Sequence, residues 1–577
     1  MRGLDLLRLG RLRGEGPSAA GEGAGDARPR ARASAAAIVP AFAVGLAAVL
    51  VRGIPILGSG GFPLNDGGLF YSMARDLQAN SFLMPATTSY NGADIPFAYP
   101  PLGIYLVAFL HLALPVRLID LFVWLPLALS LASVAAMFFL ARQLLPTRFH
   151  ALVATAAFAV APQSYMWVIE GGGVTRGLGL LLALLAAGWT VRYLGDGRTS
   201  QGALAMLAGG LAVASHPNAA LFAVLAVVLL GLQARTLGRP LRILIGMGIV
   251  SAPWWAIVAV RLGPTGLVSA GSLDGPAVVA LRGFLELLSF STTGEVFLPI
   301  VEATGFLGLL LCLNRRSWLL PVWLAVELLV DERLGTMYAM VPLCLAAGYG
   351  LADVVMPAFV RVSDYGRDLM PGELWRSTAL RDGLLGILCI ATFGSLVFDL
   401  AAVSPEHALP AATREAYQWV SDNTPAAASF AIITGSPAGT DGSQEWFPAL
   451  TSRMSVATPQ GVEWLGAEKW RSTYKDNVAL QACASDTAEC LLAWASDRGG
   501  APQYVLLPKG PLLGAGSPND CCTALRHSLL ASGDFAVAYD GPGATIVRWP
   551  AVAARKARAG RESELPRILT GESEAAV

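Results

Sequence analysis

The sequence has few charged residues. Of its 577 residues, only 14% are Asp, Glu, Lys or Arg, 54% are apolar, and the mean hydropathy is +0.54. Soluble globular chains carry about 25% charged residues, so this composition excludes an ordinary soluble protein. An excess of one charge sign is also lacking, because 41 basic residues balance 41 acidic ones. A nucleic-acid partner, which a basic excess would favour, is therefore not expected.

Two familiar sequence patterns are also missing. None of the seven cysteines belongs to a CxxC pair, so their spacing predicts neither a zinc site nor a thiol redox motif. Period-two alternation, typical of outer-membrane barrels, is missing as well. The chain instead contains twelve apolar segments, at about 36–55, 101–115, 119–141, 150–168, 174–193, 201–215, 218–233, 242–261, 298–313, 318–330, 336–357 and 383–403. Several exceed the roughly 18 residues of a membrane-spanning helix, which predicts a polytopic α-helical membrane protein.

The arginines predict the orientation of these segments. Residues 1–34 are rich in arginine, and further arginines lie at 142–148, 192–198, 235–242, 315–316 and 361–381. The positive-inside rule places all of these in the cytoplasm. The opposite, external side then receives 58–100, 169–176, 216–217, 262–297, 331–335 and everything after 404.

A cytoplasmic N-terminus and an external C-terminal region require an odd number of crossings, so one of the twelve segments must fail to span. We assign this exception to 101–115, which is short and contains His111 and Pro115. The expected fold is therefore a bundle of about 11 transmembrane helices. High Ala, Gly and Arg usage points to a bacterial source, and hence to the bacterial cytoplasmic membrane.

This orientation divides the chain into four regions. Residues 1–34 form a disordered cytoplasmic tail, and 35–403 form the transmembrane domain, with an external loop at 58–100. Residues 404–550 alternate helix and strand patterns between Gly, Pro and Asp turns, which predicts an extracytoplasmic α/β domain. Residues 551–577 are charged and form a second disordered tail.

The cysteines agree with this division. Three lie in apolar segments, where buried thiols are expected: Cys312, Cys344 and Cys389. Four lie in the predicted external domain, where disulfides are permitted, with their pairing left open: Cys483, Cys490, Cys521 and Cys522.

An acidic residue follows the first apolar segment. Asp66 lies in Asn65-Asp66-Gly67-Gly68, before a stretch whose apolar residues recur at helical spacing. This pattern predicts an amphipathic helix on the membrane surface, with Asp66 near its N-terminus. Asp is also a preferred N-cap residue, so a purely capping role and a role in a functional pocket both stay open.

The external loop ends in Tyr99-Pro100-Pro101-Leu102, whose prolines predict an extended approach and then a helix start. The order of a span, an Asp-containing helix, a long loop and PPL resembles the first external loop of the GT-C superfamily of membrane glycosyltransferases. Members include the protein O-mannosyltransferase and aminoarabinose transferase group and the oligosaccharyltransferases. The chain departs from many relatives in having Gly67 where they have a second acid, and it lacks the WWDYG signature of oligosaccharyltransferases.

The resemblance implies a substrate class and a role for Asp66. GT-C enzymes use polyprenyl-phosphate-linked sugars, so it implies transfer of a sugar to an envelope glycan, lipid or protein. The first-loop Asp of the superfamily acts as catalytic base or helps to hold a divalent metal, and only Asp66 matches that position. A carboxylate is suited to accept the proton of an attacking hydroxyl. Glu170 is a second carboxylate for Mg²⁺ or Mn²⁺ if the loops meet, and a metal-free reaction stays open.

The leaving lipid phosphate requires positive charge. Two arginines lie on the inferred outer face: Arg333 is the first candidate, and Arg176, after the glycine run 171–173, is the second. A guanidinium offers forked donors that match phosphate oxygens. The alternatives are snorkelling at the interface, or a local ion pair with Asp331 or Glu170.

Further polar residues are candidates for lining a cavity: Asn65, Tyr99, His216, Glu327 and Asp331. His216 lies in a predicted external turn and is interpreted as a turn residue rather than a base. Glu327 and Asp331 share a helix face in an apolar segment, where a structural role is favoured for Glu327. Trp254 and Trp255 are interpreted as part of an interfacial aromatic belt.

The leading hypothesis is a membrane glycosyltransferase with Asp66 as base. A polytopic transporter or lipid flippase is the main alternative, since many spans and a few membrane acids also suit substrate passage. Such a protein would show internal repeats, and none is found. A third reading is a noncatalytic envelope scaffold whose C-terminal domain binds a partner.

Overall fold

The computed structural model describes most of the chain between residues 28 and 550. The described residues are 28–263, 266, 276–330, 335–358, 408–436, 438, 442–510 and 521–550, with scattered positions between 383 and 397. The predicted final apolar segment, 383–403, therefore lies largely outside them, as do Cys389 and both predicted tails except residues 28–34. Residues 28–34 belong to the first helix, so that helix begins within the predicted tail.

The chain divides into two compact units. The first comprises residues 1–85 and 97–405, and the second comprises 86–96 and 406–577. Sequence analysis assigned the whole loop 58–100 to the membrane region, whereas its central residues 86–96 pack into the second unit.

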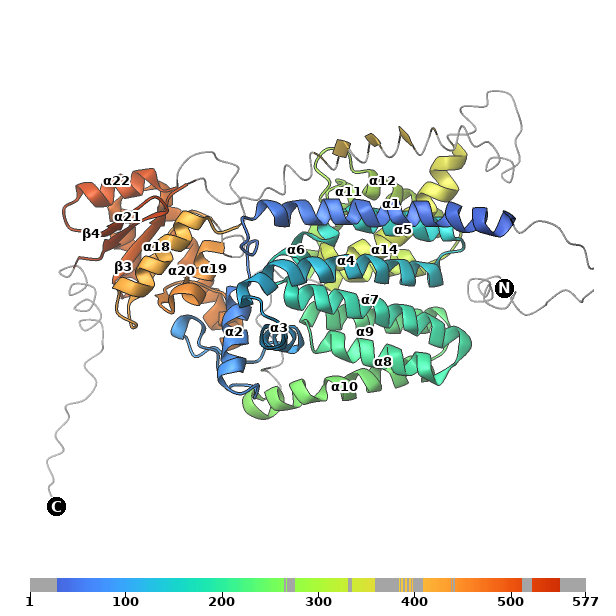
Figure 1. Ribbon diagram of the computed structural model, residues 1–577, viewed down its shortest axis with the longest axis horizontal. Helices are drawn as coiled ribbons and strands as arrows, with labels where there is room; N and C mark the ends of the chain where they lie inside the picture. The colour runs from blue at the N-terminus through green and yellow to red at the C-terminus, as the bar shows by residue number, and fades with distance from the viewer. Residues whose placement is uncertain are drawn as a thin grey trace, which may run out of the picture. The chain divides into compact units, whose positions relative to one another are not determined.

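The first unit is helical (Figure 1). Its helices are α1 (Arg28–Gly58), α2 (Gly68–Ala79), α3 (Leu102–Ala113), α4 (Leu118–Leu144), α5 (Arg148–Val160), α6 (Met166–Ile169), α7 (Gly173–Asp196), α8 (Thr199–Val213), α9 (Pro217–Gln233), α10 (Gly238–Leu262), α11 (Pro276–Leu288), α12 (Ile300–Asn314), α13 (Leu319–Val330) and α14 (Gly335–Tyr349), which continues into the π-helix η5 (Gly350–Val355). The 3₁₀ turn η3 (Pro162–Ser164) separates α5 from α6.

Helix length separates two groups within this unit. Among the described residues, five segments are long and apolar enough to cross a membrane: Pro40–Gly58, Leu118–Leu144, Gly173–Asp196, Gly238–Leu262 and Thr336–Ala358. Six further apolar helices are shorter, and α3, with 12 residues, rises only about 18 Å. Because the other five are also short, the expectation that 101–115 is the segment that does not span stays a prediction. The mostly helical membrane class is thus confirmed, while a total of about 11 crossings stays a prediction.

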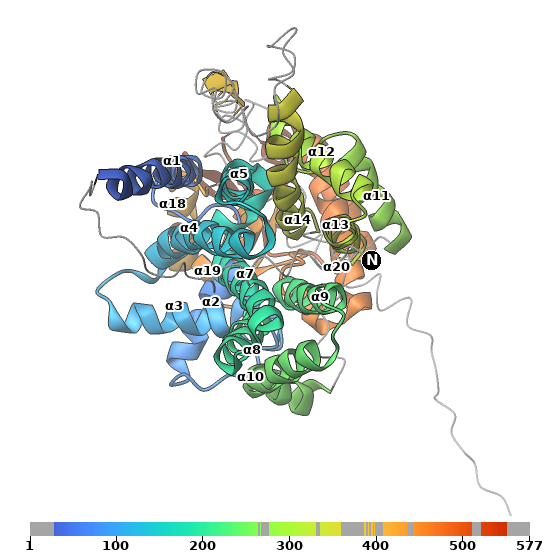
Figure 2. The ribbon, with the colours of Figure 1, turned by 90° about the vertical axis from the view of Figure 1, so that its right-hand side faces the viewer.

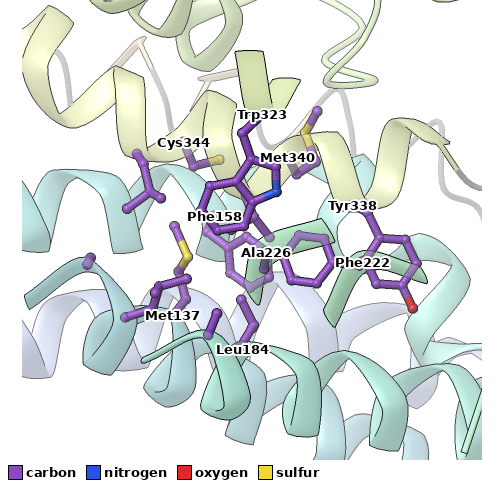
Figure 3. Packing of buried hydrophobic residues seen from close by; sticks show 14 of the residues in the cluster. Met137, Phe158, Leu184, Phe222, Ala226, Trp323, Tyr338, Met340 and Cys344 are labelled. Carbon is purple, nitrogen blue, oxygen red and sulfur yellow. The ribbon is translucent and has the colours of Figure 1, made fainter. Parts of the chain in front are cut away.

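The long helices pack in sequence across the unit. Helix α7 packs between α4 and α8, and α10 packs against the other side of α8 (Figures 1 and 2). In the core, the Phe222 ring of α9 stacks on Trp323 of α13 at 5.6 Å and contacts Tyr338 of α14 at 5.3 Å (Figure 3). These three fully buried rings tie the later helices to the α4–α9 group, so the site-bearing helices rest on a packed core.

The second unit contains a five-stranded sheet flanked by helices. The strands, in the order β2-β1-β3-β5-β4, are β2 (Met454–Ser455), β1 (Ser429–Ile432), β3 (Tyr504–Pro508), β5 (Ala544–Arg548) and β4 (Ala536–Asp540). Strands β2, β1 and β3 are parallel, and β5 pairs antiparallel with β3 and β4. The helices are α18 (Ala411–Asn423), α19 (Gly442–Thr451), α20 (Ala467–Ala482), α21 (Ala488–Arg498) and α22 (Thr523–Ala531).

The cysteines follow the division into units. Cys483 pairs with Cys490 and Cys521 pairs with Cys522, both in the second unit. Cys312 and Cys344 are free and buried in the helical unit, where buried thiols were expected.

Residues 86–96 are held in the second unit by hydrogen bonds. The Tyr90 hydroxyl donates to the Glu445 carbonyl oxygen at 2.8 Å. The Asn91 side chain donates to the Ser455 carbonyl at 3.0 Å and accepts from the Ser455 N–H at 2.6 Å, so it pairs with strand β2 as a neighbouring backbone would. Tyr90 and Asn91 are both buried.

Candidate active site

The backbone before α2 turns the Asp66 side chain away from that helix. Gly67, with φ 123°, occupies the N-cap position of α2, and no side chain caps the helix. Such a φ strains any residue with a Cβ, which explains the glycine. The alternative that Asp66 caps α2 is therefore wrong. Its carboxylate lies instead at the N-terminus of α7, more than a hundred residues later in the chain.

Three hydrogen bonds hold the Asp66 carboxylate. Oδ1 accepts from the Gly172 N–H at 2.7 Å and from Arg176 Nη2 at 2.9 Å, and Oδ2 accepts from Arg176 Nη1 at 2.7 Å. The side chains of Arg176 and Asp66 are only 10% and 12% exposed. An ionised carboxylate offers about four acceptor positions, and one position on Oδ2 receives no donor from the described residues.

Arg176 is held on several sides. Its Nε donates to the Trp167 carbonyl at 2.7 Å, and Nη2 also contacts Glu170 Oε2 at 3.2 Å. Two carboxylates thus surround one guanidinium, which leaves a local net charge of −1. The ion pair with Glu170 is one of the alternatives that the sequence left open for Arg176. That Arg176 binds a phosphate stays a prediction.

The glycine run before α7 allows this close approach. A Cβ on Gly171 would collide with the Asp66 backbone carbonyl. A Cβ on Gly172 would lie 2.6 Å from Asp66 Oδ2 and 2.9 Å from Arg176 Nη1. Both distances are shorter than real Cβ contacts, so the carboxylate and the guanidinium can meet only over a residue without a side chain. From the sequence, the run matched no known nucleotide loop and carried no specific signal.

The Tyr99-Pro100-Pro101-Leu102 segment borders the same place. The Tyr99 hydroxyl lies 3.3 Å from Thr175 Oγ1, one residue before Arg176. The Leu102 N–H donates to the Ala214 carbonyl at the end of α8. Trp254 donates from Nε1 to the Ala98 carbonyl at 3.0 Å, so it anchors the segment rather than serving only in an interfacial belt.

His216 follows α8 and caps α9. Its Nδ1 accepts from the Asn218 N–H at 3.2 Å, and its ring lies edge-on to Tyr99, with ring centres 6.1 Å apart. Burial, and then the positive charge of nearby Arg176, lower the pKa of the His216 imidazole from 6.5 to about 3. The ring is therefore neutral at physiological pH, with its proton on Nε2.

The structure thus gathers most of the predicted site residues and leaves others elsewhere. Those that meet are Asp66 with neighbouring Asn65, Glu170, Arg176, Tyr99 and His216. Glu327 lies in α13, almost fully buried, and accepts from Trp323 Nε1 at 3.1 Å, which fits the structural role. Arg333 and Asp331 lie outside the described residues. Thr175 and the Trp167 carbonyl were not foreseen, since nothing in the sequence distinguishes them.

The predicted metal does not fit this arrangement. Asp66 and Glu170 do meet, but the Arg176 guanidinium lies between them and supplies the positive charge that a divalent ion would bring. Within the described part of the chain, no three His, Cys, Asp or Glu side chains are placed to hold a metal. The residues as placed therefore do not favour a metal, and the assignment of Mg²⁺ or Mn²⁺ to Asp66 and Glu170 stays a prediction.

Comparison by sequence identifies no relative. No family model matches the chain, and no curated protein matches it. Structural comparison does find similar proteins. ArnT from Cupriavidus metallidurans in the apo state is 15% identical, with a TM-score of 0.52 over 90% of this chain and 99% of ArnT. ArnT bound to undecaprenyl phosphate gives the same TM-score at 14% identity, over 88% of this chain and 98% of ArnT.

Two further structures agree. The oligosaccharyltransferase AglB from Archaeoglobus fulgidus, in complex with an inhibitory peptide and a dolichol-phosphate, is 14% identical, with a TM-score of 0.51 over 82% of this chain and 69% of AglB. The mycobacterial arabinofuranosyltransferase AftD is 14% identical, with a TM-score of 0.50 over 88% of this chain and 41% of AftD. All three are GT-C glycosyltransferases, so the GT-C fold expected from the first external loop is confirmed.

Proposed function

We propose that this protein is a GT-C-type membrane glycosyltransferase that moves a sugar from a polyprenyl-phosphate donor to a cell-envelope acceptor, with Asp66 as base. One observation carries the proposal: Gly172 and Arg176 fix the first-loop carboxylate, and no other described residue donates to the remaining position on Oδ2. The fold supports the donor class, because the similar ArnT structure binds undecaprenyl phosphate.

The residues present suit a direct displacement. The acceptor hydroxyl attacks the anomeric carbon while its proton passes to Asp66 Oδ2. The bond from that carbon to the phosphate oxygen breaks, and its electron pair leaves with the lipid phosphate. A single carboxylate acting in this way gives inversion at the anomeric carbon. The Gly172 N–H and the two guanidinium donors of Arg176 fix the base in position. Such fixed positioning of a catalytic group supplies much of the rate enhancement of a buried active site.

The two arginine candidates are unequal as partners of the leaving phosphate. Two carboxylates already neutralise Arg176, so a phosphate placed there would meet a local charge of −1. Arg333 therefore stays our first assignment, and Arg176 serves chiefly to hold the base. No step in the proposal uses a metal.

We place the reaction on the outer face of the bacterial cytoplasmic membrane. The arginine-rich connections support a cytoplasmic position for the opposite ends of the helices. The C-terminal unit is then extracytoplasmic, as the predicted α/β domain, and two disulfides among its described residues suit that compartment. The acceptor is an envelope glycan, lipid or protein.

The test is donor turnover by the purified protein. It is incubated with undecaprenyl phosphates that carry mannose, glucose or arabinose together with an envelope extract, and release of undecaprenyl phosphate is measured. Asp66→Asn removes the base, and we expect a loss of about 10² to 10⁴-fold. Asp94→Asn is the matched control, because Asp94 is exposed in the same loop and asparagine tolerates its φ of 50°. Normal turnover by Asp66→Asn would exclude the assigned role.

A further inference from the structure

His216 carries a side-chain donor that none of the described residues uses. The side chain is buried, with 6% of the residue exposed, and Nδ1 already caps α9. The ring is neutral, so Nε2 carries the proton, yet no residue in the described part of the chain accepts a hydrogen bond from it. Nε2 itself is not among the fully buried polar atoms without a partner in the described part of the chain, so it reaches the surface of a largely buried side chain. An accessible donor beside Tyr99 and Arg176 is placed to meet an acceptor from outside the chain.

The groups around the ring favour an uncharged acceptor. Arg176 faces the ring from α7, but Asp66 and Glu170 more than neutralise its charge. A phosphate would therefore be repelled, whereas a sugar oxygen would not. The Tyr99 ring, which is only half-buried, lies beside His216 and offers an aromatic face of the kind on which sugars stack.

We infer that His216 is a substrate-binding residue whose Nε2–H donates to an uncharged oxygen of the donor's sugar. This inference rests on the proposed function. It gives the sugar a place between Tyr99 and the Asp66 carboxylate, and it leaves the lipid phosphate to another cation. A histidine acting as a cation would carry a second proton, and one acting as a base would need a free ring nitrogen, whereas Nδ1 already accepts from the Asn218 N–H.

Two substitutions separate the Nε2–H donor of His216 from its capping of α9 through Nδ1. His216→Asn keeps an acceptor near the Nδ1 position for the Asn218 N–H but removes the Nε2–H. His216→Gln carries an N–H near the Nε2 position but loses the capping acceptor. We expect His216→Asn to keep its thermal stability and lose sugar binding. We expect His216→Gln to lose about 1 kcal/mol of stability and to bind the sugar better than His216→Asn does.

The decisive measurement compares lipids with and without a sugar. Dissociation constants are measured in detergent for undecaprenyl phosphate and for undecaprenyl phosphate linked to mannose, glucose or arabinose. His216→Asn should weaken at least one sugar-linked lipid by about 5 to 100-fold, in line with one hydrogen bond, and leave undecaprenyl phosphate unchanged. Equal weakening of both lipids would assign His216 to the phosphate and overturn the inference. No weakening, or no preference of the wild type for any sugar-linked lipid, would overturn it as well.

The failure of this inference differs from failure of the proposed function. If the wild type releases no undecaprenyl phosphate from any sugar-linked lipid, the glycosyltransferase proposal fails, while the binding comparison still decides the role of His216. If turnover occurs, kcat/KM of His216→Asn should fall without a change in the pH profile between pH 5 and 8. If kcat/KM of the wild type changes with pH near 6.5 and this change is lost in His216→Asn, His216 titrates there. That result would contradict a neutral His216 that acts as a donor.

Discussion

The pairing of Asp66 with Arg176 determines what the carboxylate can do. A free carboxylate on the surface could rotate, whereas this one accepts a fork of two guanidinium donors and the Gly172 N–H. The fork and the Gly172 N–H fix the orientation of the carboxylate. A base fixed in this way depends on residues that never touch the substrate.

Gly172 provides the clearest test of that dependence. In Gly172→Ala, the new Cβ would lie 2.6 Å from Asp66 Oδ2, so the carboxylate and the guanidinium must separate. We expect donor turnover to fall at least about tenfold, the effect of misplacing a catalytic group slightly. Gly195→Ala is the matched control, since it lies in the same helix with open space around it. Equal activity of the two variants would show that the pair does not position the base.

His216 makes a separate prediction about stability and pH. An unfolded imidazole takes up a proton near pH 6.5, but the folded one stays neutral until about pH 3. The unfolded state then binds more protons, so the free energy of unfolding falls as the pH drops through this range. Between pH 7 and pH 4.5 the loss is on the order of 2–3 kcal/mol.

Thermal unfolding of the wild type and of His216→Asn, each at pH 7 and pH 4.5, checks this. The asparagine variant should lose less stability on acidification. His527→Asn, at an exposed position, should behave as the wild type does. A wild type and a His216→Asn variant that lose equal stability would contradict the neutral, buried ring.

Single residues could be nominated from the sequence, but their partners could not. Asp66, Glu170, Arg176 and His216 attract attention because each is polar next to an apolar segment. The contact of Asp66 with Arg176 joins positions far apart in the chain, and only packing of the helices creates it. The same holds for the predicted metal ligands: two acids were foreseen to meet, but not the arginine between them.

At the scale of helices, Arg52 fixes the elements that carry the site. It is fully buried in α1 and donates to five acceptors: the Ser130 carbonyl and hydroxyl, the Phe158 and Ala159 carbonyls and the Ser164 hydroxyl. Phe158 and Ala159 lie in the last turn of α5, where carbonyls have no partner within the helix. Arg52 therefore stabilises the break after α5, and the chain continues from there through α6 to Gly172.

Removal of the Arg52 guanidinium should destabilise the helical unit. Arg52→Met fills a similar volume but removes all five buried hydrogen bonds of the guanidinium, so we expect a loss of at least about 3 kcal/mol. The measurement is thermal unfolding in detergent, with Arg75→Met as control, because Arg75 is exposed on α2. An unchanged melting temperature for Arg52→Met would contradict the role of this hydrogen-bond network.

Element boundaries were predicted unevenly for physical reasons. Apolar length identified the continuous helices α4, α7 and α10 well, because each presents one long hydrophobic run. The segment 150–168 was predicted as one helix, yet it breaks at Pro162. The break depends on Arg52, a charged residue within the first apolar segment, and that unusual position was a signal the sequence offered.

At the scale of the whole molecule, residues 86–96 restrict the membrane topology. Their hydrogen bonds to Glu445 and Ser455 place this loop and the C-terminal sheet in one unit. Both must therefore lie on the same side of a membrane, and the chain must cross it an even number of times between residues 97 and 406. The odd total that the arginine pattern predicts requires in addition that α1 crosses the membrane, and Pro40–Gly58 is long and apolar enough to do so.

The GT-C fold could be predicted from the order of features along the chain, although no family model or curated protein matches its sequence. A fold of this kind needs apolar helices of suitable length, and many sequences satisfy that condition. The insertion of the loop into the C-terminal unit was not foreseen, because it depends on a few buried contacts such as that of Asn91 with Ser455.

Cysteine accessibility in intact cells tests the topology. Ala86→Cys and Ser532→Cys place exposed thiols in the two parts of the second unit, and Leu237→Cys places one in the turn between α9 and α10. A membrane-impermeant maleimide should label the first two in intact cells and label Leu237→Cys only after permeabilisation. If labelling of all three positions is reversed, the proposed orientation is wrong, but the number of crossings between residues 97 and 406 is still even. Different accessibility of Ala86→Cys and Ser532→Cys would contradict the packing of residues 86–96 on the sheet, because no membrane can separate two parts of one hydrogen-bonded unit.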